Sequence, residues 1–208
     1  LGLIIQKIEL FSNRGKLTHA ILEENVHKAT SIIKNMSTTI DDFRDFFKPN
    51  KEMEYFDIKT VVYDVISLQE ASLKEAEISI DINIDQPICE LYGFKNEFAQ
   101  VVINLINNAK DALIENHVVN GFISISGKNK KDKVVFKLSD NAGGIPAGII
   151  DRIFEPYYTT KEEGKGTGIG LYMSKMIIEE NMHGTLQVRN SEVGAEFSII
   201  FKNTRGKL

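Results

Sequence analysis

The amino-acid sequence has little of several features, and each shortage excludes a class of protein or site. A single cysteine, Cys89, among 208 residues rules out an internal disulfide and a multi-cysteine metal site, and it favours a reducing compartment. The net charge of −4 and the pI near 5.7 leave no general basic surface for nucleic acid or anionic membranes. No apolar run approaches the roughly 20 residues of a membrane span, and we expect no signal peptide. We therefore expect a soluble chain without a nucleic-acid partner.

Residues 1–48 predict a helical hairpin with its turn at residues 12–15. Apolar residues recur there at alternating steps of four and three, which is typical of a helix packed along one stripe. A second copy of the hairpin would close the stripe in a dimeric four-helix bundle, although the hairpin could instead pack on the rest of the chain. The stripe comprises Leu1, Ile4, Ile8, Phe11, Leu22, Val26, Ala29, Ile33, Met36, Ile40, Phe43 and Phe47.

Residues 49–208 predict a second domain, which mixes helices and strands. Apolar alternation predicts strands at residues 78–84, 122–126, 134–138, 185–189 and 195–201. Apolar residues at helical spacing predict helices at 58–68, 95–116 and 171–180, and Asp57 is placed to cap the first of them. The simplest arrangement is an α+β fold, an α/β sandwich with one mixed sheet and helices on a single face.

The helix predicted at residues 95–116 carries a polar stripe. Asn104, Asn108 and Asp111 lie at i, i+4 and i+7, away from the apolar face. Amide and carboxylate oxygens suit a hard cation that keeps most of its waters and bridges to phosphates, as Mg²⁺ does. A solvated helix face would explain one such asparagine, but three polar groups on one stripe favour a site.

Asp140 follows the strand predicted at 134–138 and precedes the glycine pair 143–144. A carboxylate that accepts from an exocyclic amine distinguishes adenine from guanine, which has a carbonyl at that edge. The same residue types are also common in turns, so this motif alone leaves both interpretations open.

A glycine-rich run, Gly-Lys-Gly-Thr-Gly-Ile-Gly-Leu at 164–171, leads into the last predicted helix. Such a loop presents backbone N–H groups to phosphate oxygens. The segment before it, residues 145–166, has few apolar anchors and is typical of a lid. Lys161 and Lys165 could neutralise phosphates there, or could be solvated loop charges. Together with the two preceding motifs, this run predicts an ATP-binding module.

Four motifs in this order resemble the sensor histidine kinases. The helix segment 104–113 is similar to the N box, 140–145 to the first glycine box, 154–161 to the F box, and 166–171 to the second glycine box. The preceding hairpin resembles the family's dimerisation and phosphotransfer domain. The resemblance implies the ATP-binding fold shared with gyrase and the heat-shock chaperone ATPases.

The resemblance also implies roles for individual residues. It places Mg²⁺ on Asn108, adenine on Asp140 and phosphate contacts on the backbone of residues 166–171, with Asn104 and Lys161 at the reacting phosphate. The full set of expected nucleotide-binding residues is Asn104, Asn108, Asp111, Asp140, Gly144, Ile145, Tyr158, Thr160, Lys161, Gly166, Thr167, Gly168, Ile169, Gly170 and Leu171.

The sequence departs from this family in three places. Ala142 stands where the family usually has glycine, and Ala195 stands where a threonine often precedes the last strand's aromatic residue. None of the four histidines lies in the family's phosphoacceptor motif; they are His19, His27, His117 and His183. We therefore expect the acceptor histidine just upstream of residue 1.

As a histidine kinase, the protein would pass its phosphoryl group to an aspartate of a response-regulator receiver domain. It would act in the cytoplasm as a homodimer, and any membrane attachment would come from a region upstream. Three other functions stay open, one of them a kinase that phosphorylates protein hydroxyls with the same ATP-binding fold. Gyrase-like or chaperone-like ATPases carry a glutamate where Asn104 stands, to activate water. A non-catalytic, ATP-gated interaction module would need no acceptor histidine.

Overall fold

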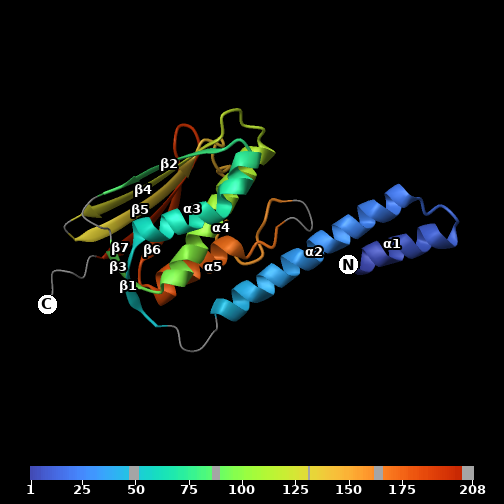
Figure 1. The fold of residues 1–208 in the computed structure, drawn as a ribbon, viewed down its shortest axis with the longest axis horizontal. Coiled ribbons are helices and arrows are strands. Elements are labelled where there is room, and N and C mark those ends of the chain that lie inside the picture. The colour runs from blue at the N-terminus through green and yellow to red at the C-terminus, as the bar shows by residue number, and fades with distance from the viewer. Residues whose placement is uncertain (47–51, 86–89, 131, 162–165, 203–208) are drawn as a thin grey trace. The chain divides into compact units, whose positions relative to one another are not determined.

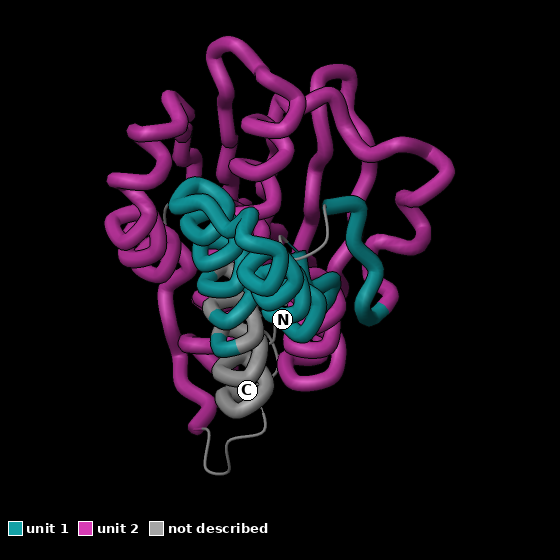
Figure 2. Tube along the Cα trace, turned by 90° about the vertical axis from the view of Figure 1, so that its right-hand side faces the viewer, with its two compact units in different colours: residues 1–48, 156–169 teal, residues 49–155, 170–208 magenta. Residues whose placement is uncertain are grey.

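The computed structural model describes residues 1–46, 52–85, 90–130, 132–161 and 166–202. Cys89, Lys165 and the predicted domain boundary at Pro49 lie outside these residues. The chain divides into two compact units (Figure 2). The first comprises Leu1–Lys48 and Pro156–Ile169, and the second comprises Pro49–Glu155 and Gly170–Leu208.

The first unit contains a helical hairpin of α1 (Gly2–Asn13) and α2 (His19–Phe46). Gly15 has a φ of 63° in the connecting turn, a backbone conformation that favours glycine, and its N–H donates to the Ser12 carbonyl at 2.9 Å. Several apolar side chains of both helices are exposed, including Leu3 at 78%, Val26 at 50% and Ile33 at 55%. The predicted hairpin is present, and its dimerisation stays a prediction.

The second unit is built on a five-stranded sheet in the order β2-β4-β5-β7-β6. Its strands are β2 (Ser79–Ile84), β4 (Phe122–Lys130), β5 (Lys133–Asp140), β6 (Thr185–Asn190) and β7 (Ala195–Lys202). The β2 and β4 strands are parallel, and the other neighbours are antiparallel. Figure 1 shows α3 (Ile58–Glu75), α4 (Lys95–Glu115) and α5 (Gly170–Met176) on one side of this sheet. The predicted α+β fold with one mixed sheet is confirmed.

Two elements of the second unit differ from the sequence-based expectation. A small antiparallel ribbon joins β1 (Glu54–Asp57) to β3 (Glu90–Gly93), and neither short strand was predicted. The sequence predicts one uninterrupted helix over 171–180. The structure instead changes after α5 to a π-helix, η1 (Ile177–Asn181), at whose end the Met182 N–H donates to the carbonyl of Ile177, five residues earlier.

The core of the second unit lies between the sheet and the helices. Buried residues alternate along β5 and β7, so each strand turns one face to the helices. Phe98 of α4 is fully buried, and its ring lies 5.6 Å from those of Phe56 and Phe136 and 6.3 Å from that of Phe201. One α4 side chain thus joins β1, β5 and β7, which fixes α4 against the sheet.

A local signal sets the start of α3. The predicted cap is confirmed, because Asp57 Oδ1 accepts from the Lys59 N–H at 3.0 Å at the start of α3.

Within the described part of the chain, no helix is long and apolar enough to cross a membrane.

We expect Phe98→Ala to lower the free energy of unfolding by about 3–5 kcal/mol, because it leaves a cavity among three aromatic rings. Leu68→Ala, at a position that is 78% exposed on α3, should change it by less than about 0.5 kcal/mol. Urea denaturation measures both values. Similar losses in the two variants would contradict the assigned core.

Candidate nucleotide site

Asp140, the last residue of β5, is a buried carboxylate at a sheet end, with 6% of its surface exposed. Its Oδ1 accepts from the backbone N–H groups of Ala142, at 2.9 Å, and Ala195, at 3.2 Å. Burial raises the pKa of Asp140 above its ordinary value of 3.8, and these two hydrogen bonds offset part of that rise. Both bonds end on Oδ1, so Oδ2 keeps its acceptor capacity for a ligand amine.

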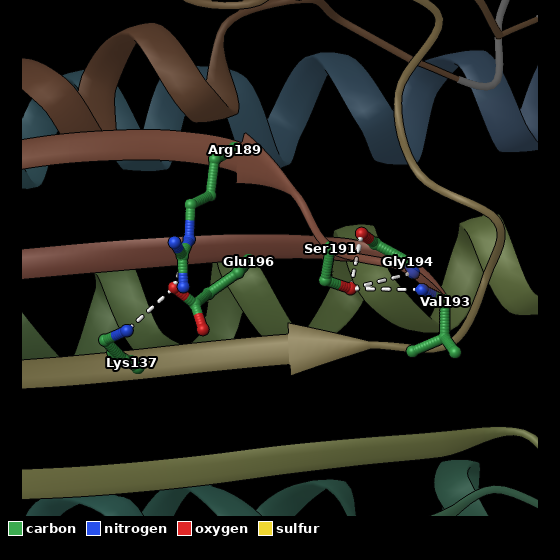
Figure 3. Close-up of polar contacts among 6 residues, drawn as sticks. All are labelled: Lys137, Arg189, Ser191, Val193, Gly194 and Glu196. Atoms are coloured by element: carbon green, nitrogen blue, oxygen red, sulfur yellow. Dashed lines mark hydrogen bonds and ion pairs between the residues drawn. The ribbon is translucent and has the colours of Figure 1, made fainter.

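The turn between β6 and β7 lies directly against Asp140. Gly194 touches the Asp140 backbone so closely that a Cβ there would overlap its carbonyl oxygen. Ser191 Oγ accepts from the N–H groups of Val193 and Gly194, at 3.3 and 3.0 Å (Figure 3). Beyond the turn, Glu196 of β7 is tied to both neighbouring strands, because Arg189 of β6 and Lys137 of β5 both donate to its Oε1 at 2.8 Å. These hydrogen bonds therefore hold the turn in one position beside the Asp140 carboxylate.

The loop after Asp140 is held by partners from several elements. The Ala142 carbonyl accepts from Asn116 Nδ2 at 2.7 Å, and the Gly143 N–H donates to the Val193 carbonyl at 2.9 Å. Gly143 and Gly144 have φ values of 89° and 85°, whereas Ala142 does not lie in that region. Alanine at position 142 is therefore tolerated, because the two residues after it adopt the conformations that favour glycine.

Ile145 has both of its main-chain polar groups engaged. Its N–H donates to Asn190 Oδ1 at 2.8 Å, and its carbonyl accepts from Asn190 Nδ2 at 2.7 Å. The Ile145 N–H is thus already paired, so a nucleotide contact of Ile145 is left to its side chain or to the second lone pair of its carbonyl oxygen. Asn190, like Asn116, was not found from the sequence, because the partners lie 45 and 26 residues apart and neither asparagine belongs to a motif.

The polar stripe of α4 has its first residue fixed against α5. Asn104 Nδ2 donates to the buried Ser174 Oγ at 2.9 Å, and Gly170 lies so close to Asn104 Oδ1 that a side chain there would overlap it. Gly170 is thus required by close packing with the asparagine. Ser174 was also missed, because its role depends on a contact across 70 residues.

Asn108, one turn along α4, has an unsatisfied amide. Among the described residues, its Nδ2 is the buried side-chain polar atom that lacks a hydrogen-bond partner. A buried donor without a partner is costly, so such a group is typical of a site that a ligand completes. The amide could donate to a phosphate oxygen or a bound water while its oxygen coordinates Mg²⁺. Asp111 follows on the same helix and is half-buried.

The amide chemistry of α4 suits Mg²⁺ better than a transition metal. Within the described ranges, no group of three or more histidine, cysteine, aspartate or glutamate side chains could hold a metal ion. A site that draws on an amide oxygen, waters and ligand phosphates fits the way magnesium binds. The residues present therefore fit the cofactor that the sequence predicts.

Most of the remaining predicted site residues belong to the first unit. A Cβ at Gly166 would fall 2.6 Å from Thr159 Oγ1, and Gly168, with a φ of 66°, lies against the Tyr157 main chain. Both glycines are thus needed for close packing in their own segment. The predicted residues of this unit are Tyr158, Thr160, Lys161, Gly166, Thr167, Gly168 and Ile169, whereas Gly170 and Leu171 belong to the second unit. The nucleotide contacts of all of them stay predictions.

Asp140→Asn should separate stability from binding. The variant keeps an oxygen for both backbone N–H groups but removes the buried charge, and it places a donor where an amine would bind. Because the pKa is raised in the folded state, the wild-type protein loses stability as pH rises through that pKa. We expect the variant to be more stable than wild type at pH 7, with an advantage that shrinks towards pH 3, and to bind adenine nucleotides more weakly. Denaturation across pH measures the first effect, and an advantage that is independent of pH would contradict it.

Comparison with known proteins places this geometry in a family. The family described as histidine kinase-, DNA gyrase B-, and HSP90-like ATPase matches residues 93–205. The sensor kinase CckA of Brucella abortus is 31% identical over 188 residues, which cover 83% of this chain and 18% of that protein. Sporulation kinase E of Bacillus subtilis is 31% identical over 164 residues, or 78% of this chain and 21% of that protein. The chain thus spans about a fifth of the length of these relatives.

Solved structures agree with this assignment. The catalytic domain of the histidine kinase ThkA has a TM-score of 0.65 and 28% identity, over 73% of this chain and 95% of that domain. A crystal structure of ThkA in complex with the response regulator protein TrrA has a TM-score of 0.75 over 99% of this chain and 59% of that chain; at 24% identity it shows the fold alone. The chain therefore belongs to the histidine kinase-, DNA gyrase B- and HSP90-like ATPase family, with a catalytic ATP-binding domain of the histidine kinase kind.

Proposed function

We propose that this chain is the ATP-binding catalytic part of a sensor histidine kinase. It would transfer the γ-phosphoryl group of ATP to a histidine, for relay to an aspartate of a response-regulator receiver domain. The observation that carries this choice is Asn104, an amide at the position where hydrolytic members of the family place a glutamate. An amide does not take a proton from water at neutral pH, so it does not activate water for hydrolysis.

Each part of the ATP molecule is assigned to residues of this chain. Asp140 Oδ2 accepts from the adenine amine, Asn108 holds Mg²⁺, and backbone N–H groups of residues 166–171 bind the phosphates. Magnesium, when bound, neutralises charge on the phosphate oxygens. Lys161 adds positive charge at the γ-phosphate. Ser174 holds the Asn104 amide, which orients its oxygen towards Gly170.

The transfer step needs positioning more than covalent chemistry from the protein. A nitrogen lone pair of the acceptor imidazole attacks the γ-phosphorus, the bond to the bridging oxygen breaks, and ADP leaves with that electron pair. His19, His27, His117 and His183 lie outside the acceptor motif, so we propose that the acceptor lies upstream of residue 1.

We propose that the hairpin of α1 and α2 forms a homodimer. Its exposed apolar side chains, among them Leu3, Val26 and Ile33, would be covered in a four-helix bundle of two hairpins. ATP and receiver domains are available in the cytoplasm, which we propose as the site of action.

Labelling with γ-³²P-ATP and Mg²⁺ tests the proposal. The chain of residues 1–208 should bind ATP and stay unlabelled, whereas the chain extended upstream should acquire label that is acid-labile and base-stable, as expected for phosphohistidine. Replacing an upstream histidine should abolish that label. An extended chain that binds ATP but only releases inorganic phosphate would favour a gyrase-like ATPase. One that binds ATP but neither acquires label nor releases phosphate would favour an ATP-gated interaction module.

Asn108→Ala should weaken ATP binding by roughly tenfold or more in the presence of Mg²⁺. It removes both the amide oxygen that would coordinate the ion and the amide N–H that would donate to a phosphate oxygen. With EDTA in place of Mg²⁺, the difference from wild type should shrink. Asn107→Ala, the neighbouring amide off the polar stripe, is the matched control and should bind as wild type does. Calorimetry measures all three chains, and equal affinities with Mg²⁺ for wild type and Asn108→Ala would refute the assigned magnesium ligand.

A further inference from the structure

We propose that Asn190 is a positioning residue for recognition of the nucleotide base. With Gly144 and Ile145 it forms a contact that we call the Asn190 clamp. The inference rests on the proposed function, because it assumes that Asp140 reads the base. Asn190 lies at the end of β6, outside every sequence motif that predicts the site.

The clamp uses both polar ends of one side chain on one residue. Asn190 Oδ1 accepts from the Ile145 N–H at 2.8 Å, and Asn190 Nδ2 donates to the Ile145 carbonyl at 2.7 Å. This pattern reproduces what a neighbouring strand offers, at a place where the loop has left the sheet. Two bonds to one peptide segment fix its orientation as well as its position.

The Asn190 clamp leaves no room for a side chain at Gly144. A Cβ at this position would fall 2.8 Å from Asn190 Oδ1 and 3.0 Å from its Cγ, and the φ of 85° favours glycine independently. The neighbouring Gly143 differs, because no heavy atom lies within 4 Å of the place its Cβ would occupy. The space beside Gly143 is therefore open, whereas the Asn190 side chain fills the space beside Gly144.

The clamp completes a set of ties that begins at Asp140. Ala142 is held through its N–H by Asp140 and through its carbonyl by Asn116, and the Gly143 N–H is held by the Val193 carbonyl. Beyond Gly143, the described structure gives the loop its next tie at Asn190. Without the Asn190 tie, the chain beyond the Gly143 N–H, which includes Gly144, is free to sample many conformations, and only a fraction of molecules keeps the form that fits the base.

The exposure of Asn190 separates this role from a role in folding. Its hydrogen bonds lie at the surface, and the side chain is not part of the core. Substitutions at exposed positions usually change stability little, so variants at this position should fold. A change in binding that depends on the base would then report loop position rather than loss of the fold.

The test compares ADP, GDP and inorganic tripolyphosphate, each with Mg²⁺, by calorimetry on the whole chain. Asn190→Ala removes both bonds, and Asn190→Asp keeps the acceptor but loses the donor to the Ile145 carbonyl. The matched control is Gln187→Ala, an exposed residue of the same strand that alternation places on the opposite face.

We expect both Asn190 variants to bind ADP more weakly, by roughly tenfold for Asn190→Ala, because the binding-competent fraction falls. The preference for ADP over GDP should fall with it, whereas tripolyphosphate affinity and Gln187→Ala should match wild type. Unchanged ADP affinity in both variants, or equal weakening of ADP and tripolyphosphate, would overturn the clamp alone. A wild-type chain that binds none of the three ligands would instead refute the proposed function on which the clamp rests.

Discussion

The buried carboxylate of Asp140 is the constraint on which the base end of the site depends. One of its oxygens accepts from two backbone N–H groups that are 53 residues apart, those of Ala142 and Ala195. It therefore ties the loop after β5 to the start of β7, and Gly194 must lack a side chain to allow that approach. Burying a carboxylate is costly unless hydrogen bonds compensate, and here the second oxygen is left with capacity for a ligand. A site that binds an amine is a physical reason for such an arrangement.

The polar stripe of α4 differs from Asp140 because it relies on amides. Asn104 is held by Ser174, and the Asn108 amide keeps a buried donor without a protein partner. Amides bind metal-bound water and phosphate without taking up a proton at neutral pH. This chemistry suits holding a triphosphate for transfer to an incoming nucleophile, and it is poorly suited to activating water. The choice between kinase and hydrolase therefore depends on these side chains rather than on the shared fold.

The sequence predicted the fold well where the signal is local. Alternation along residues 134–138 and 195–201 gave the central strands, and the spacing of apolar residues gave α4 to within one residue of its end. The β1–β3 ribbon was missed because its strands have four residues each and pair across an intervening helix and strand. The π-helix was missed because its apolar pattern continues that of α5.

The candidate site shows the same division. Asp140, Asn104 and Asn108 belong to compact motifs and were predicted, whereas Asn116, Ser174 and Asn190 act through partners far away in the sequence. No pattern within a short window reports such a contact. Gly144 and Gly170 were predicted as nucleotide contacts, and the structure adds a packing reason for each, against Asn190 and Asn104.

A crystal structure of the chain with Mg²⁺ and a non-hydrolysable ATP analogue is the most direct test of the central claim that Asp140 and Asn108 hold the two ends of ATP. The account predicts the adenine amine within hydrogen-bond distance of Asp140 Oδ2, and Mg²⁺ at about 2.0–2.1 Å from the Asn108 amide oxygen. A base bound away from Asp140, or a metal ion that Asn108 does not coordinate, would contradict it.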